Sequence, residues 1–291
     1  MGKRLWEEDP LSRELYQKAN QILGLDLTEL SFEGPPEELN QTVNAQPAIF
    51  LHSMAALNLL KREGVKPQAV VGHSLGEYSA LVGSGVLSFE DGLRAVKLRG
   101  ELMQGAGEKQ SGTMAAIIGL KADQVEEICR EVGGLVKVAN YNSPLQMVIS
   151  GEVGAVEKAV ELAKEKGAKR AVLLKVSGAF HSPLMEPAKG KMREFLSEVE
   201  FHPPQIPFFS TVSAQREDEP IRIRRLLEDQ ITSPVRWTEA VEGLSALNAQ
   251  ASLEVGPGKV LSGLLKRINR ETKVYPVSDQ EEMRMFLENA P

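Results

Sequence analysis

The chain has 291 residues, a formal net charge of −6, 42% hydrophobic residues and 25% charged residues. These proportions are typical of a soluble globular protein, and the length suits one large domain or a domain with an inserted module. The acidic balance argues against a nucleic-acid-binding protein, and no apolar run approaches the roughly 18 residues of a membrane span.

The start of the chain and its single cysteine, Cys129, indicate the cellular setting. Residues 1–10 lack the apolar core of a signal peptide. One cysteine excludes an internal disulfide and a cysteine-based metal site, so a reducing cytoplasm is the expected location. Cys129 lies in a helical pattern over residues 124–132 and is expected to be a small core residue.

The first part of the chain is predicted to be mainly helical, because its apolar residues recur at helical spacing. The predicted helices cover residues 11–24, 46–63, from about 76 to 82, and 89–104, with one strand at 69–71. The helix at 89–104 is expected to end in Gly105-Ala-Gly107. A doubly wound sheet usually opens with a strand, so a first clear strand near residue 69 is unusual.

A nucleophile elbow is predicted where this strand meets the next helix. Gly72-His-Ser-Leu-Gly76 matches G-x-S-x-G, which is a common chance string but here has the required strand before it and helix after it. In so tight a turn, a Cβ at either glycine is expected to collide with its neighbours. The turn would expose the Ser74 hydroxyl and direct the Leu75 N–H at an oxygen of the attacked group. We therefore expect a nucleophilic serine.

The middle of the chain has a separate pattern, which we expect to be an inserted module covering the serine. Its order is strand, helix, strand, strand, helix, strand, the ferredoxin-like arrangement. The predicted elements are 113–119, 122–131, 135–139, 146–150, 156–166 and 171–176, with Asn140–Pro144 as the loop between the central strands. Alternation of strands and helices then resumes at 207–212, 221–230, 237–246, 251–255 and 259–268.

A nucleophilic serine needs a base within hydrogen-bond reach, usually a histidine, and the chain has 4 of them. His52 is expected to be a packed or half-exposed helix residue, and His202 a surface residue. His73 adjoins Ser74 in the elbow, so its side chain must point elsewhere and is expected to give structural support. His181 follows the last strand of the inserted module, where α/β folds place chemistry, and is the candidate base.

The acid of a hydrolase triad is not evident. Between Ser74 and His181 the only aspartates are Asp91 and Asp123, and both lie on predicted helices rather than at strand ends. A backbone carbonyl is an alternative partner that would fix the tautomer of His181.

Several segments, in order along almost the whole chain, together resemble a known family. They are Gly72-His-Ser-Leu-Gly-Glu77, Lys97-Leu-Arg-Gly100, Asn140-Tyr-Asn-Ser-Pro144, Gly178-Ala-Phe-His-Ser182, Pro234-Val-Arg-Trp237 and Glu254-Val-Gly-Pro-Gly-Lys-Val-Leu261. The chain resembles the malonyl-CoA:acyl carrier protein transacylases, within the acyltransferases of fatty-acid and polyketide synthesis. This implies an α/β-hydrolase-like large subdomain (1–110 and 177–291) with a ferredoxin-like small subdomain (111–176).

The resemblance implies transfer of a malonyl group from malonyl-CoA to the pantetheine thiol of acyl carrier protein, without a cofactor or a metal. Ser74 would attack the thioester, and His181 would take its proton and later activate the carrier thiol. Gln230 matches the residue whose main-chain oxygen holds the histidine. The Leu75 N–H would serve as an oxyanion donor.

The resemblance also implies a substrate-binding set. Arg99 matches an arginine that pairs with the free carboxylate of malonate, which a bidentate guanidinium suits, although its spacing alone predicts a solvated helix residue. Phe180 would fill the space that an α-methyl group needs. Asn142 is placed with the substrate-binding residues.

One departure from the family is visible at the start. Family members begin with an apolar strand and a Gly-Gln-Gly-Ser-Gln turn whose glutamine supplies a second oxyanion donor, and Met1-Gly-Lys-Arg-Leu5 resembles the segment just after that turn. From this we expect the 291-residue chain to be poorly stable and weakly active.

Two other functions stay open at this point. One is an esterase or thioesterase on a similar core, which the lifetime of the acyl-enzyme in water would distinguish. The other is a catalytically impaired module that binds acyl-CoA or the carrier protein, which labelling of Ser74 by malonyl-CoA would test. Basic clusters are candidate contacts for an acidic carrier protein, or simply solvated faces: Lys189, Lys191 and Arg193, and Arg222, Arg224 and Arg225.

Overall fold

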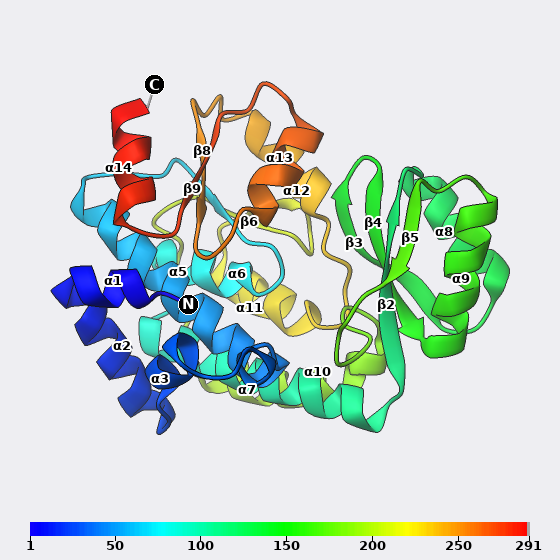
Figure 1. The fold of residues 1–291 in the computed structure, drawn as a ribbon, viewed down its shortest axis with the longest axis horizontal. Helices are drawn as coiled ribbons and strands as arrows, with labels where there is room; N and C mark the ends of the chain where they lie inside the picture. Colours follow the sequence, from blue (N-terminus) through cyan, green and yellow to red (C-terminus); the bar gives the residue numbers. More distant parts are fainter. Residues whose placement is uncertain (290–291) are drawn as a thin grey trace.

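The computed structural model describes residues 1–289, so residues 290–291, at the end of the predicted large subdomain, lie outside the described part. The chain folds as a mixed α/β protein in which a smaller four-stranded sheet with its helices lies beside a larger part that holds both chain ends (Figure 1). No helix within residues 1–289 combines the length and apolar character needed to cross a bilayer.

Helices dominate the first part of the chain, as predicted, although α1, α3 and α4 had no clear signal in the sequence. They are α1 (Lys3–Glu8), α2 (Pro10–Leu23), α3 (Leu27–Phe32), α4 (Pro36–Leu39), α5 (Thr42–Arg62), α6 (Gly76–Gly83) and α7 (Phe89–Lys109). Most of α5 is buried from Gln46 to Leu60, and it forms the centre of the larger hydrophobic core with α6 and α7.

Helix α7 is longer than predicted, because it runs through Gly105 and Gly107 to Lys109. At Gly107 an added Cβ would lie 1.9 Å from the carbonyl oxygen of Ser177. The glycine therefore has a packing role rather than a helix-ending one. It lets the segment that leads to His181 lie directly against α7.

The small sheet has the strand order β3-β4-β2-β5 with antiparallel neighbours, and its strands and helices follow along the chain in the predicted order. Its elements are β2 (Gly112–Ile118), α8 (Ala122–Val132), β3 (Val136–Ser143), β4 (Gln146–Glu152), α9 (Val153–Glu165) and β5 (Arg170–Leu173). Helices α8 and α9 enclose a core of their own with one face of this sheet, and Cys129 is buried in it as expected.

The predicted loop Asn140–Pro144 is mostly strand. Strand β3 continues to Ser143 with register shifts, and Asn140 forms a parallel bridge with Val235 of the larger part. The backbone there donates from Tyr141 N to Val235 O over 2.9 Å. This bridge brings Asn142 to the boundary between the small sheet and the larger part of the protein.

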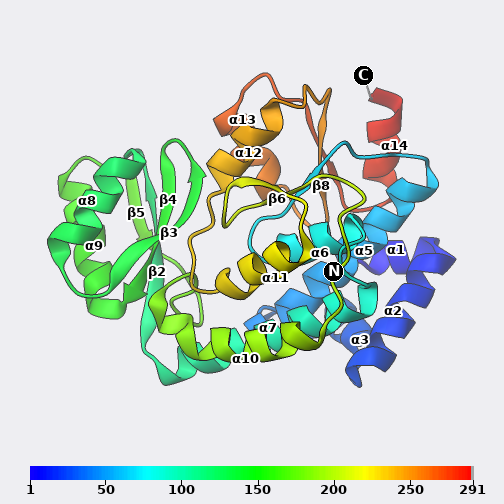
Figure 2. The same cartoon turned by 180° about the vertical axis from the view of Figure 1, so that it is seen from behind.

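The last part of the chain surrounds the elbow strand β1 (Val70–Val71). Its elements are a 3₁₀ turn at Pro183–Met185, α10 (Glu186–Glu198), β6 (Phe208–Ser210), β7 (Gln215–Glu217), α11 (Pro220–Asp229), α12 (Trp237–Ser245), β8 (Ser252–Val255), α13 (Val260–Ile268), β9 (Val274–Val277) and α14 (Gln280–Asn289). Strand β6 pairs parallel with β1 and antiparallel with β7, while β8 and β9 form a separate parallel pair. Figure 2 shows this part of the chain, with β6, β8, α11 and α12, from behind.

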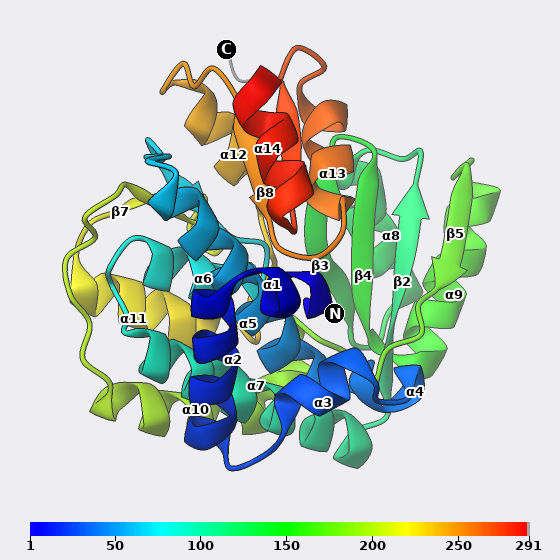
Figure 3. The ribbon, with the colours of Figure 1, turned by 60° about the vertical axis from the view of Figure 1, so that its left-hand side comes forward.

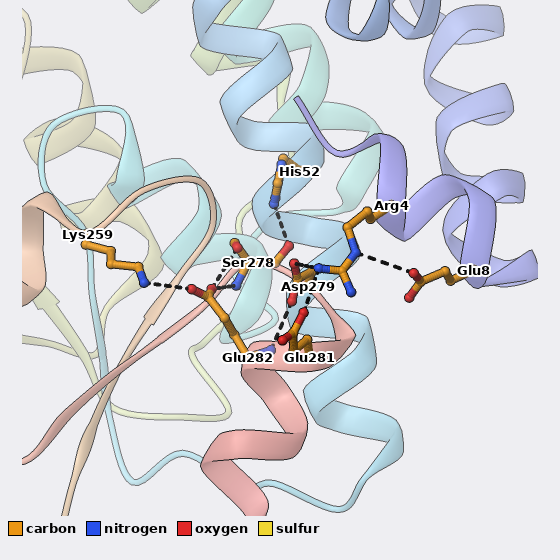
Figure 4. A network of polar contacts seen from close by, with 8 residues as sticks. All are labelled: Arg4, Glu8, His52, Lys259, Ser278, Asp279, Glu281 and Glu282. Atoms are coloured by element: carbon orange, nitrogen blue, oxygen red, sulfur yellow. Dashed lines mark hydrogen bonds and ion pairs between the residues drawn. The ribbon is translucent and has the colours of Figure 1, made fainter.

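The two ends of the described chain meet, with α1 lying next to the start of α14 (Figure 3). Arg4 Nη1 lies 3.0 Å from Asp279 Oδ2 and 2.9 Å from Glu281 Oε2 (Figure 4). Half of the Arg4 side chain is exposed, so these pairs orient the two ends but add little to the free energy of folding.

Candidate active site

The elbow has the geometry that a nucleophilic serine requires. Ser74 adopts φ = 51°, a strained value for a residue that is not glycine. A Cβ at Gly72 would lie 2.0 Å from the carbonyl carbon of Gly76 and 2.2 Å from the amide nitrogen of Glu77, so only glycine fits there. At Gly76 an added Cβ would meet no atom within 4 Å, so the predicted collision is wrong at that position.

Ser74 and His181 meet although 107 residues separate them: Ser74 Oγ lies 2.8 Å from His181 Nε2. The other ring nitrogen, Nδ1, lies 2.9 Å from the carbonyl oxygen of Gln230 and 3.1 Å from that of Ser233. A carbonyl oxygen only accepts, so Nδ1 carries the proton and Nε2 presents its lone pair to the serine.

No carboxylate among residues 1–289 bonds to His181. Asp91 and Asp123 lie on α7 and α8, as predicted, and Asp91 accepts from Ser88 at its helix start. The carbonyl of Gln230 therefore takes the orienting place that an aspartate holds in a hydrolase triad.

The histidine is held in its neutral, proton-accepting form. Its side chain is buried, and that burial, followed by the positive charge of Arg99, lowers the pKa of His181 to about 3. Burial disfavours the charged imidazolium, and a neighbouring cation disfavours it further. At neutral pH the ring is ready to take the serine proton.

Arg99 is buried at this centre, with 1% of its surface exposed, so the solvated position that its spacing predicts is wrong. Its Nη1 donates to Gln46 Oε1 over 2.7 Å, and its Nη2 to Ser74 Oγ over 2.9 Å and to Gln230 Oε1 over 3.1 Å. All of these acceptors are neutral, and Nε has no partner among the described residues. No carboxylate among the described residues contacts the guanidinium directly, so an anionic group could pair with it there.

The backbone N–H of Leu75 lies beside the nucleophile, as the elbow predicts. Among residues 1–289 it has no hydrogen-bond partner, and it precedes the first turn of α6. A free N–H at the start of a helix suits a developing oxyanion.

The side chain of His73 contacts residues at the boundary between the small sheet and the larger part, rather than the catalytic pair. Its Nε2 lies 2.8 Å from Asn142 Oδ1, and its ring packs against Trp237 at a centroid distance of 5.5 Å. The predicted substrate residue Asn142 is therefore anchored through its oxygen. Its Nδ2 has no protein partner in the described part of the chain.

Phe180 precedes His181 and is half-buried where the two parts of the protein meet. It packs against both the large core and a small apolar cluster on the inner face of the small sheet, made of Met114, Ala139 and Val148. It also lines a pocket of about 300 Å³ with polar residues of α5 and α7. Its ring thus limits the volume of that pocket.

The remaining histidines agree with prediction. His52 is buried in α5, and its Nε2 lies 2.8 Å from the carbonyl oxygen of Ser278 (Figure 4). His202 is exposed in the loop after α10.

Sequence reasoning missed Gln46, Glu77 and Ser233. Gln46 lies in the first turns of α5 with no pattern to mark it, and the role of Ser233 is played by its main chain. Glu77 had a signal: an acidic residue in the first turn of the elbow helix, facing inward.

Comparison with known proteins shows the family of this chain. Residues 1–284 match the model of the acyl transferase domain family. The malonyl CoA-acyl carrier protein transacylase of Bacillus subtilis (strain 168) is 45% identical over 291 residues, which cover 99% of this chain and 92% of the relative. The protein of the same name from Escherichia coli (strain K12) is 42% identical, over 96% of this chain and 91% of the relative.

Solved structures with the same fold match nearly the whole chain. An acyl-carrier-protein S-malonyltransferase from Bartonella henselae superposes with a TM-score of 0.95 at 44% identity, covering 99% of this chain and 94% of that one. A malonyl-transacylase in complex with its type II PKS acyl-carrier protein superposes with a TM-score of 0.96 at 42% identity, covering 99% and 94% of the two chains.

Proposed function

Since this chain belongs to the malonyl CoA-acyl carrier protein transacylases of the acyl transferase family, we propose that it moves a malonyl group from malonyl-CoA to acyl carrier protein through an acyl-enzyme on Ser74. The observation that carries the mechanism is the position of Ser74 Oγ, 2.8 Å from His181 Nε2 and 2.9 Å from Arg99 Nη2. The Ser74 hydroxyl therefore has two hydrogen-bond partners, a base in His181 and a cation in Arg99.

The first half-reaction follows from these positions. Ser74 Oγ attacks the thioester carbonyl while His181 Nε2 takes its proton, and the Leu75 N–H donates to the oxyanion. Collapse breaks the carbon–sulfur bond, and His181 returns the proton to the leaving CoA sulfur. In the second half-reaction His181 takes the proton of the carrier thiol, whose sulfur attacks the malonyl ester. Collapse breaks the ester bond to Ser74 Oγ, and His181 returns the proton to that oxygen. The Gln230 carbonyl holds the imidazole in place through both halves.

Transfer is favoured over hydrolysis by the partner of His181 and by Arg99. The site lacks the carboxylate that completes a hydrolase triad, among the described residues, and it holds a buried cation that an esterase of neutral acids does not need. We propose that Arg99 pairs with the free carboxylate of the malonyl group. Phe180 would exclude an α-branch, and Asn142 Nδ2 would donate to the acyl or pantetheine portion.

Replacing Arg99 with alanine is expected to lower kcat/KM for malonyl loading roughly 10- to 100-fold, the worth of a hydrogen bond to a charged group. Acetyl loading should be unchanged or faster, because acetyl has no carboxylate and a buried unpaired cation disfavours it. Loading from malonyl-CoA and acetyl-CoA measures this. Arg94→Ala, on the exposed side of the same helix, is the matched control. If kcat/KM falls equally for malonyl and acetyl loading, Arg99 has a structural role and does not set acyl specificity.

The exposed end of α11 is the proposed contact for the carrier protein. Of the basic residues on α10 and α11, most already pair with acids: Lys189 with Asp229, Arg193 and Arg224 with Glu228, and Arg222 with Glu217. Lys191 and Arg225 have no such partner among residues 1–289.

Arg225 is the stronger of these two candidates. It lies one turn from Ile221, whose side chain is 63% exposed. It is also five residues before Gln230, about 7.5 Å along the helix from the residue that holds the catalytic histidine. A cationic and apolar surface at that distance suits an acidic carrier with a pantetheine arm.

Charge reversal tests this surface. Arg225→Glu is expected to raise KM for the carrier protein roughly 3- to 10-fold at low salt, with a smaller effect at high salt because exposed charges are screened. Loading of Ser74 from malonyl-CoA should not change. The control is Lys158→Glu on α9, on the outer side of the small sheet. If the KM for the carrier protein is the same in Arg225→Glu and Lys158→Glu, the carrier protein binds at another surface.

We infer the finer architecture from strand order. The sequence β3-β4-β2-β5 with helices α8 and α9 on one face supports a ferredoxin-like small subdomain over residues 111–176. The elbow between β1 and α6 supports an α/β-hydrolase-like large subdomain, over residues 1–110 and from 177 onward. A cytoplasmic location remains part of the proposal.

The proposed function is tested by incubation with malonyl-CoA and measurement of intact mass. The expected result is one malonyl adduct per chain, located on the peptide that contains Ser74. A protein that binds malonyl-CoA without gaining this mass would be a binding module instead.

A further inference from the structure

Glu77 is a buried carboxylate that the mechanism above does not use. It lies in the first turn of α6, three residues after the nucleophile, with 1% of its surface exposed. Its Oε1 accepts from Thr211 N over 2.5 Å and from Thr211 Oγ1 over 3.1 Å, and its Oε2 accepts from Gln230 Nε2. Burial raises the pKa of Glu77, and the hydrogen bonds from Thr211 and Gln230 act against this rise. The Thr211 N–H and Gln230 Nε2 can only donate, so the geometry around the carboxylate suits its ionised form.

The contact with Gln230 decides which way its side-chain amide points. Gln230 is fully buried, its Nε2 donates to Glu77 and, over 3.0 Å, to the carbonyl oxygen of Ser74. With Nε2 fixed in this way, Oε1 must face Arg99, from whose Nη2 it accepts over 3.1 Å. A flipped amide would turn its NH₂ group toward the guanidinium. Both groups are donors, so no hydrogen bond could form between them.

Glu77 is also the balancing charge for Arg99. Burial lowers the pKa of Arg99, whereas Tyr78 and then Glu77 raise it, and Glu77 is the only carboxylate among the described residues that does so. The two charges do not touch, since the amide of Gln230 lies between them. The guanidinium is therefore stabilised in the core without being occupied by an anion of the protein.

We propose that Glu77 is a positioning residue for acyl selectivity: through the amide of Gln230 it holds the Arg99 guanidinium charged, oriented and free for the malonyl carboxylate. A direct ion pair with Arg99 would compete with the substrate, whereas a carboxylate one amide away does not. This inference rests on the proposed function, because it gives Glu77 a role only if Arg99 binds the acyl carboxylate.

The variant Glu77→Gln separates orientation from size. The Thr211 N–H needs an acceptor, so the new amide keeps its oxygen there and turns its NH₂ group toward Gln230. Gln230 must then flip, which removes one of the two acceptors of Arg99 Nη2 and leaves only Ser74 Oγ. We expect kcat/KM for malonyl loading to fall roughly 10- to 100-fold, mainly through KM, and acetyl loading to fall less than about 3-fold. The main-chain carbonyl of Gln230 still holds His181.

A matched control is Glu254→Gln. Glu254 is similarly buried, and its carboxylate accepts from Leu261 N over 2.9 Å and from Ser262 N over 2.7 Å at the start of α13. This change is expected to lower the melting temperature without changing the ratio of malonyl to acetyl loading. If the ratio of malonyl to acetyl loading falls in both variants in proportion to the loss of melting temperature, the role of Glu77 is merely structural.

A double-mutant cycle with Gln230→Met tests whether Glu77 acts through that amide. If it does, adding Glu77→Gln to Gln230→Met changes selectivity no further. Additive effects would overturn the proposal. Should Glu77→Gln fail to fold, the pair Glu77→Met with Gln230→Met replaces both partners by apolar chains, which costs less than stranding one. That pair must also lose the malonyl preference, and a retained preference would refute the role of Glu77.

The failure of this inference can be told from failure of the proposed function. A wild-type enzyme that loads acetyl as well as malonyl would contradict the proposed function itself. A wild type that prefers malonyl, loses the preference in Arg99→Ala and keeps it in Glu77→Gln would overturn only the role of Glu77.

Discussion

The Ser74→Ala variant is expected to form no malonyl adduct. Ser74 is the residue of the elbow turn, and its Oγ lies 2.8 Å from the base. The covalent step has no other nucleophile so placed among residues 1–289. Intact-mass measurement after incubation with malonyl-CoA should therefore show only the unmodified chain.

The matched control is Ser79→Ala, further along α6, which should load like the wild type. Melting temperatures of both variants show whether the fold is retained. A malonyl mass on a folded Ser74→Ala protein would mean that the acyl group is carried elsewhere, and the mechanism would be wrong.

The His181→Ala variant is expected to slow both half-reactions roughly 10²- to 10⁴-fold, the usual contribution of a positioned base. The adduct should still form on Ser74, only slowly, because the nucleophile and the Leu75 N–H remain. Single-turnover loading and transfer to carrier protein measure the two halves separately. His202→Ala, at an exposed site, is the control. A loss confined to one half-reaction would contradict a base shared by both.

The lowered pKa of His181 has a consequence for pH dependence. A free histidine titrates near 6.5, whereas burial and Arg99 hold His181 neutral down to a pKa of about 3. We expect kcat/KM for loading to show no loss centred near pH 6.5, since this parameter reports the free enzyme. Because the folded pKa is depressed, the stability gained from neutral His181 is present above pH 6.5 and is lost as pH falls toward 3. The melting temperature of wild type should therefore fall more steeply with acid than that of His181→Ala.

The chemistry that depends on local sequence was predictable. The elbow needs only a strand, a glycine at position 72, the serine and a helix, all contiguous. The small sheet follows from alternation of short patterns in the order strand, helix, strand, strand, helix, strand. His181 could be chosen because only 4 histidines exist and the others had structural explanations.

The rest depends on contacts between distant segments. Strands β7 and β9 were not predicted, since β7 is polar and each is stabilised by its pairing partner rather than by its own pattern. Helix α7 continues through Gly107 because a distant segment packs on it. Spacing placed Arg99 on a solvated face, and only the family resemblance put it in the site. The role proposed for Glu77 depends on its hydrogen bond with Gln230, which is 153 residues away and could not be read from the sequence.

The central claim is that Ser74 carries the malonyl group to a thiol rather than to water. The direct test is to isolate the malonyl-enzyme, free of malonyl-CoA, and to follow its mass with and without acyl carrier protein. We expect an adduct that persists in buffer and moves within the dead time of mixing to the pantetheine thiol once the carrier is added. Loss of the malonyl mass at the same rate with and without carrier protein, with free malonate as the product, would contradict the account.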